Sequence, residues 1–361
     1  MFFTIIITFI SLIGLIVLHE LGHFIMARRF GVRVEEFGIG LPPRIFGKKI
    51  GETIYSLNLL PLGAFVKLYG EEKDIKDPRS FSSKPIWQRI LIIIGGVVVF
   101  WIVAFVILSI LMVIGMATIV GDEANDNLVN PKVQIAQVVA NSPAEKAGLK
   151  IGDTIRYLKS SDKQLSIDKV KEVQNFTALN LGKEITLTIQ RGKETSEIKL
   201  TPRDSPPEGE GPMGIDLART ATITYPWYQA PFRGILATAD LTIVITKSFG
   251  LLLKSVITGE GLPPGTRIMG PVGIFGLFNQ MAQLGTSYFL RFVAVISVYL
   301  AVFNILPIPA LDGGKLAFLV IEAVRRKPIS QKIEQNITAL FFFLLIAMII
   351  FVTFRDIQRL F

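Results

Sequence analysis

The sequence predicts a polytopic α-helical membrane protein with about four spans, a membrane-associated β-segment and an inserted α+β domain. Half of the 361 residues are hydrophobic and the mean hydropathy is +0.51, which is too apolar for a soluble chain of this size. A helical span needs about 20 predominantly apolar residues. Four uncharged stretches meet or approach that length, and they cover residues 1–18, 90–121, 292–311 and 335–354.

The first part of the membrane domain, residues 1–121, contains the β-segment between its two spans. Residues 32–70 are punctuated by Gly and Pro, and β-branched and aromatic residues alternate with polar ones. This pattern predicts short strands at 32–38, 53–59 and 64–69. Backbone that is irregular at membrane depth needs protein or a cavity to satisfy its polar groups, so we expect residues 59–63 to lie against other parts of the chain.

Residues 122–204 are soluble in character. Strand-like alternation is present at 133–139, 184–190 and 197–200. A short helix is predicted after Ser142, which is a suitable N-cap before Pro143, and Gly148 is expected to end it. Residues 205–235, rich in Pro and Gly at their start, are expected to form a linker or loop.

The second part of the membrane domain, residues 236–361, begins with an ambiguous helix. Residues 233–257 are long enough to span but carry Asp240, Lys247 and Lys254, spaced by seven, which places these charges on one face. A helix of this kind suits the membrane interface, and this is the interpretation we favour. The alternative is a fifth span whose charges face the protein interior.

Charge placement predicts the topology. Lys and Arg outnumber Asp and Glu in residues 28–89, and further basic residues occupy 315–332. The positive-inside rule then places both segments in the cytoplasm, and both termini and residues 122–204 outside. Because the basic residues flank spans instead of forming one stripe, no nucleic-acid partner is expected. The chain contains no Cys, which excludes disulfides and thiolate metal ligands.

The strongest chemical signal is His19-Glu20-Leu21-Gly22-His23, a His-Glu-x-x-His motif at the end of the first stretch. Residues four apart on a helix share one face, so both imidazoles are placed to bind one Zn²⁺, and Glu20 is placed beside the metal as a catalytic base. The alternative is a pair of core histidines. It is weakened because these are the only two histidines in the chain and because it leaves a Glu unexplained in an apolar span.

A catalytic zinc needs a third protein ligand and an open position. Without further His or Cys, that ligand is Asp or Glu, and Asp312 is the best candidate because it follows an uncharged span and two prolines. The alternative is that Asp312 only caps the next helix. Asn304 is a candidate donor to an oxyanion, or else satisfies backbone groups freed by Pro307.

These motifs together resemble the site-2 protease family, most closely its bacterial RseP-type regulated intramembrane metalloproteases, over nearly the whole chain. The specific pair is the His-Glu-x-x-His motif with residues 304–313, which read Asn-x-x-Pro-x-Pro-x-x-Asp-Gly. Residues 61–67 are similar to the family's re-entrant β-segment, residues 142–153 to the helix and turn of bacterial PDZ domains, and residues 270–274 to a segment before the third span.

The resemblance implies His19, His23 and Asp312 as zinc ligands, Glu20 as the base, and Asn304 near the substrate or oxyanion. It implies a PDZ-like domain at 122–204 and a multi-pass protein of the bacterial inner membrane. The expected substrate is a single-span regulator such as an anti-sigma factor, after an upstream site-1 protease has removed its outer part.

Two departures from the family pattern stand out. Gly95-Gly96 lacks the Pro and Asn that many relatives carry in the second span, and there is one PDZ-like domain where some have two. The competing function classes are a non-catalytic PDZ-bearing membrane scaffold, expected to lose Glu20 or a ligand, and a metal or proton transporter, expected to carry charges in several spans.

Overall fold

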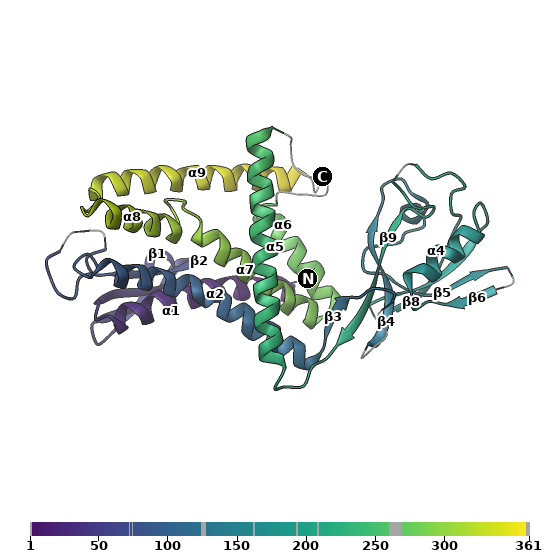
Figure 1. Ribbon diagram of the computed structural model, residues 1–361, viewed down its shortest axis with the longest axis horizontal. Coiled ribbons are helices and arrows are strands. Elements are labelled where there is room, and N and C mark those ends of the chain that lie inside the picture. Colours follow the sequence, from purple (N-terminus) through teal and green to yellow (C-terminus); the bar gives the residue numbers. More distant parts are fainter. Residues whose placement is uncertain are drawn as a thin grey trace. The chain divides into compact units, whose positions relative to one another are not determined.

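The computed structural model describes residues 2–71, 73, 75–123, 128–161, 163–192, 194–207, 209–259 and 269–358. The chain divides into two compact units (Figure 1). The helical unit comprises Met1–Ser109, Pro231–Ala282 and Leu290–Phe361, and the sheet unit comprises Ile110–Ala230 and Gln283–Phe289.

The helices of the first unit include five that are long and apolar enough to cross a membrane. They are α1 (Phe2–Arg29), α2 (Ile86–Ile114), α5 (Ala230–Thr258), α7 (Thr286–Ile305) and α9 (Gln331–Gln358). Two shorter helices, α6 (Pro271–Leu284) and α8 (Asp312–Arg325), complete the set. Length and composition do not distinguish α5 from a span, but Figure 1 shows α5 crossing α2 and α9 steeply, whereas α1, α2 and α9 share one general direction.

Two helices end earlier than the uncharged stretches that predicted them. Helix α2 ends at Ile114 because Gly115 adopts a φ of 100°, which is open mainly to glycine, and the chain then continues as a strand. Helix α7 ends at Ile305 because Pro307 and Pro309 follow. Proline has no backbone N–H to donate to the helix, and it disfavours a helical conformation in the residue before it.

The β-segment consists of two long strands, β1 (Val34–Ile50) and β2 (Thr53–Leu68), which each fold back. Residues 36–39 pair both with 54–57 and with 64–67, and residues 53–57 also pair with 46–50. Four segments therefore lie side by side in the order 46–50, 53–57, 34–39, 64–68. The predicted strands account for three of them, and 64–68 forms one edge. Val34 and Leu68 anchor the sheet by packing with Phe24 of α1 in one buried cluster.

The sheet unit is built on a seven-stranded antiparallel sheet of order β3-β9-β4-β5-β7-β8, with β6 paired to β5. Its strands are β3 (Met116–Ile119), β4 (Val129–Val138), β5 (Thr154–Ser160), β6 (Lys163–Ser166), β7 (Ile185–Arg191), β8 (Glu194–Leu200) and β9 (Ile215–Ile223). Helices α3 (Pro143–Lys146) and α4 (Val170–Leu179) accompany them. As predicted, the Ser142 hydroxyl accepts from the Glu145 N–H and caps α3.

The segment expected to be a linker contains an internal strand. Strand β9 lies within residues 205–235 and pairs with both β3 and β4. The apolar alternation of this strand is broken by Arg219, which is nevertheless buried, because its guanidinium donates to the backbone carbonyls of Gly121 and Asp168. A sequence pattern does not reveal such partners, since they come from distant parts of the chain.

Candidate metal centre

The last turns of α1 bring its two histidines together. His19 and His23 are both buried, and their Nε2 atoms lie 3.3 Å apart. Each ring is held by α2 on its other side. The His19 ring stacks on Phe100 at 4.7 Å between centroids, and His23 Nδ1 donates to the carbonyl of Ile92 at 3.0 Å. This bond fixes the proton on Nδ1 and leaves the Nε2 lone pair facing the site.

Close packing between α1 and α2 depends on three glycines. A Cβ at Gly22 would lie 2.4 Å from the Gly95 carbonyl oxygen, and a Cβ at Gly96 would lie 2.2 Å from His23 Nε2. Because Gly96 has no side chain, the His23 ring can occupy this space. The Gly95-Gly96 pair, which sequence analysis singled out only as a departure, is the surface against which the histidine helix rests.

Asp312 completes the group from a second helix. Its Oδ2 lies 3.2 Å from His19 Nε2 and 3.3 Å from His23 Nε2. Asp312 is the first residue of α8, and Leu311 occupies the N-cap position without a side-chain bond. The alternative that Asp312 serves only as a cap is therefore wrong.

The turn before α8 directs Asp312 into the site. After α7 ends, Leu306 donates to the carbonyl of Phe303, the group that Pro307 leaves without its helical donor. The chain then folds closely over the start of α8. A Cβ at Gly313 would lie 2.0 Å from the Leu306 carbonyl oxygen, and one at Gly314 would lie 2.4 Å from that of Ile308. Both glycines are needed for the turn to close.

The donor set fits a tetrahedral metal. Bonds of 2.0–2.1 Å at tetrahedral angles place neighbouring ligand atoms about 3.3–3.4 Å apart. The three distances in this group are 3.2, 3.3 and 3.3 Å. Asp312 Oδ2 is buried and has no hydrogen-bond partner among the described residues, as expected of an atom whose partner is a cation. Two imidazoles and one carboxylate leave the fourth position open.

Glu20 follows His19 directly and is about 100° round the helix, so it borders the group without joining it. It is half-buried and interacts electrostatically with His19, His23 and Asp312. Asn304 lies on the last turn of α7, where its Nδ2 donates to the carbonyl of Leu300 at 2.9 Å. One amide hydrogen is thus engaged locally, and the freed carbonyl of Phe303 is satisfied by Leu306 and not by Asn304.

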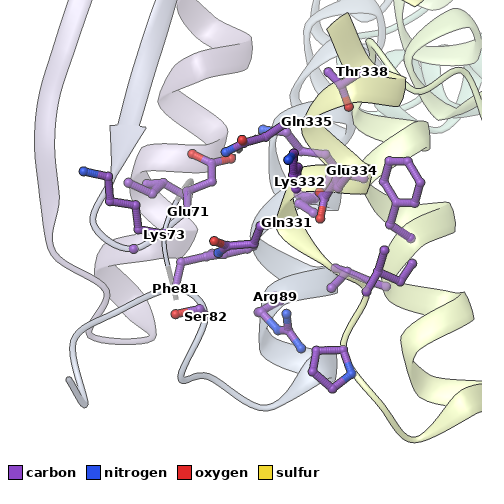
Figure 2. Close-up of a pocket in the computed structure, with 18 of the residues that line it drawn as sticks. Glu71, Lys73, Phe81, Ser82, Arg89, Gln331, Lys332, Glu334, Gln335 and Thr338 are labelled. Atoms are coloured by element: carbon purple, nitrogen blue, oxygen red, sulfur yellow. Dashed lines mark hydrogen bonds and ion pairs between the residues drawn. The ribbon is translucent and has the colours of Figure 1, made fainter. Parts of the chain in front are cut away.

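A cleft of about 1680 Å³ lies beside the start of α8. Figure 2 shows its two sides, with Glu71, Phe81 and Arg89 facing residues of α9. Ala310 and Lys315, which flank Asp312 in sequence, line it too, as does the edge segment 64–68 through Phe65 to Leu68. Two ion pairs fix α8 here: Lys315 binds Glu71, and the largely buried Arg89 binds Glu322. Sequence analysis missed both pairs, because a spacing of more than 200 residues leaves no local pattern.

Two buried histidines on one helix and a carboxylate from another could hold a metal ion, in a chain with several helices suited to a bilayer. Comparison with known proteins shows which class of protein this is. The model of peptidase family M50 matches residues 7–348. A Clostridium perfringens protein, whose name describes it as an inferred zinc metalloprotease, is 37% identical over 350 residues, covering 95% of both chains.

A similarly named Clostridium acetobutylicum protein is 33% identical over 356 residues, covering 99% of this chain and 98% of its own. The regulator of sigma-W protease RasP of Bacillus subtilis is 29% identical over 447 aligned positions, covering 100% of both. The chain belongs to peptidase family M50, the site-2 protease family, and is a multi-pass membrane metalloprotease.

Proposed function

We propose that the chain is an intramembrane zinc metalloendopeptidase that cuts a transmembrane segment of a single-span regulatory protein, such as an anti-sigma factor. The observation that carries the proposal is the tetrahedral spacing of His19, His23 and Asp312 with Glu20 beside them. The similarity to a regulator of sigma-W protease supports the substrate class. An upstream site-1 protease that trims the substrate first belongs to the same proposal.

In this proposal each side chain has one role. When bound, the zinc supplies Lewis acidity at the open fourth position. Glu20 accepts a proton from the attacking water and passes it to the leaving amine. His19 and His23 would hold the metal, with rings oriented by Phe100 and Ile92, and Asp312 would add a negative charge. The second amide hydrogen of Asn304 is our candidate donor to the oxyanion.

The substrate must be extended when it is cut, because the carbonyls of a helix are already hydrogen-bonded within it. We propose that the edge segment 64–68 receives it by strand addition, since this segment pairs on one side and lines the cleft. Residues 53–57 are paired on both sides and are therefore unsuitable.

For topology we propose four spans, with α5 lying in the interface. The ion pairs Lys315–Glu71 and Arg89–Glu322 join the two basic segments 28–89 and 315–332 in space, so both belong to one side of the membrane. Between those segments the chain crosses the membrane twice, in α2 and α7, and so returns to the same side. If α5 also spanned, three crossings would leave the two segments on opposite sides. The steep crossing of α5 in Figure 1 agrees with this. The basic residues of both segments favour the cytoplasm for that side, with both termini outside, and the bacterial inner membrane is the location that we propose.

We further propose that residues 122–204, within the sheet unit, form a PDZ-like module that filters substrates and takes no part in catalysis. The sequence contains no His or Cys in residues 122–204, so the module offers no plausible zinc site. The alternative is that it only helps the membrane part to fold. A non-catalytic scaffold is disfavoured, because Glu20 and all three candidate ligands are present.

The test is zinc content together with cleavage of a transmembrane substrate. We expect about one zinc per chain. Asp312→Ala should lose both zinc and cleavage, whereas Asp240→Ala, which removes an exposed carboxylate from α5, should lose neither. Unchanged zinc and turnover in Asp312→Ala would remove Asp312 from the site.

A further inference from the structure

Helix α9 buries a single side chain, and that side chain is a carboxylate. None of the most apolar window of α9 is buried, whereas Asp356 near its C-terminal end is 6% exposed. A charged group in an apolar helix is costly unless it is paired or hydrogen-bonded. The burial of Asp356 therefore requires hydrogen-bond partners close by.

The partners of Asp356 are the first amides of α6. Its Oδ2 accepts from the N–H of Gly270 and from the N–H of Gly273, each at 2.8 Å. These amides begin a helix and have no carbonyl of their own helix to bind. A neighbouring residue normally caps such amides, but here the cap comes from a helix more than 80 residues later. The negative charge also complements the positive end of the α6 dipole.

Both glycines lie directly against the Asp356 carboxylate. A Cβ at Gly270 would lie 2.9 Å from Asp356 Oδ2, and a Cβ at Gly273 would lie 3.1 Å from it. The Gly-Pro-Val-Gly segment at 270–273 thus has a structural explanation that sequence analysis did not supply. On its other side α6 is anchored to α7, because Phe278 is fully buried and its ring meets Phe292 at 4.7 Å.

The opposite end of α9 forms one wall of the cleft. Gln331, Glu334, Gln335 and Thr338 face the other wall across the opening in Figure 2. The cleft is lined by Ala310 and Lys315, close to Asp312 in sequence, and by Phe65 to Leu68 of the edge segment, so under the proposed function a substrate segment would enter it. Helix α9 follows α8 by a short connection at this end, and at the other end Asp356 binds the start of α6.

We propose that Asp356 is a positioning residue, which caps α6 and thereby fixes α9 as the wall of the cleft that binds the transmembrane substrate. This inference rests on the proposed function. Releasing the cap removes the two hydrogen bonds that join α9 to the start of α6, so the cleft loses its set width. Substrate binding then weakens, while the metal centre, built from α1, α2 and α8, is unchanged.

The absence of native cysteines allows a covalent replacement of the cap. The two positions are in contact, because a Cβ at Gly270 would lie 2.9 Å from Asp356 Oδ2. The double variant Gly270→Cys/Asp356→Cys therefore carries its own control, because oxidation ties α6 to α9 and reduction releases them.

We expect the oxidised variant to cleave a transmembrane substrate with the KM of the wild type, and the reduced variant to show a KM about tenfold higher, equivalent to about 1.4 kcal/mol. Zinc content and kcat should be equal in both forms. Wild type treated with the same reductant should not change. Equal KM in the two forms, or a loss confined to kcat and zinc, would overturn the proposal.

A second measurement does not need activity. Hydrogen exchange at the Gly270 and Gly273 amides should be slow in the wild type and at least about tenfold faster in Asp356→Asn, which loses the charge of the acceptor. Unchanged exchange would show that the cap does not order α6. A wild type that cleaves no transmembrane substrate would instead refute the proposed function, while the exchange experiment still tests the cap.

Discussion

Gly96→Ala is the substitution whose effect follows most directly from the geometry of the metal centre. The added methyl group would lie 2.2, 2.4 and 2.6 Å from three atoms of the His23 ring. Ordinary contact begins at 3.4 Å. The nearest ring atom, Nε2, must therefore retreat by 3.4 − 2.2, or about 1.2 Å, although the Ile92 carbonyl holds the ring in place.

That retreat exceeds what a metal site tolerates. Ligand distances in a working site are kept within about 0.2 Å. Even a group behind a ligand typically contributes 10–100-fold to metal affinity. We expect the displaced ligand in Gly96→Ala to lower zinc affinity by about 100-fold, or about 2.8 kcal/mol. Alanine stabilises a helix relative to glycine by about 1 kcal/mol. Helix propensity alone would therefore make Gly96→Ala more stable, and it does not account for weaker zinc binding.

Competition with a zinc chelator, followed by elemental analysis, measures the effect. The matched control is Gly14→Ala, the same change in α1 at a position with nothing within 4 Å of the added group. It should keep wild-type affinity. A Gly96→Ala protein that is folded and holds zinc as tightly as Gly14→Ala would refute the close approach of α2 to His23.

Three further outcomes follow from the site and the topology. Glu20→Gln should retain zinc but cleave about 10²–10⁴-fold more slowly, because a lost base affects proton transfer and not the ligand set; near-normal turnover would contradict the mechanism. Single cysteines introduced at Glu197 of β8 and at Lys327 should be labelled from outside and from the cytoplasm respectively, and the reverse pattern would invert the topology. Deletion of the PDZ-like module should preserve zinc and cleavage of short membrane substrates while raising cleavage of substrates with bulky outer domains; unchanged discrimination by a folded, zinc-loaded protein would exclude the filter.

The sequence by itself was enough to predict the class of this protein and its candidate site. Two histidines four apart on a helix share a face, and with no further His or Cys the expected third ligand is a carboxylate. Local patterns also identified the long apolar helices and the α3 cap. The structure agrees on these helices, on the cap and on the closeness of the two histidines, because helix geometry converts spacing in the chain directly into spacing in three dimensions.

The tertiary structure decided everything that depends on contacts between distant segments. It brought Asp312 to within 3.3 Å of both histidines, placed Gly96 against His23, and put β9 inside a sheet where a linker was expected. It also paired Asp356 with the start of α6. A glycine or a lone carboxylate has no periodicity, so its role is decided by whichever distant group folding places beside it.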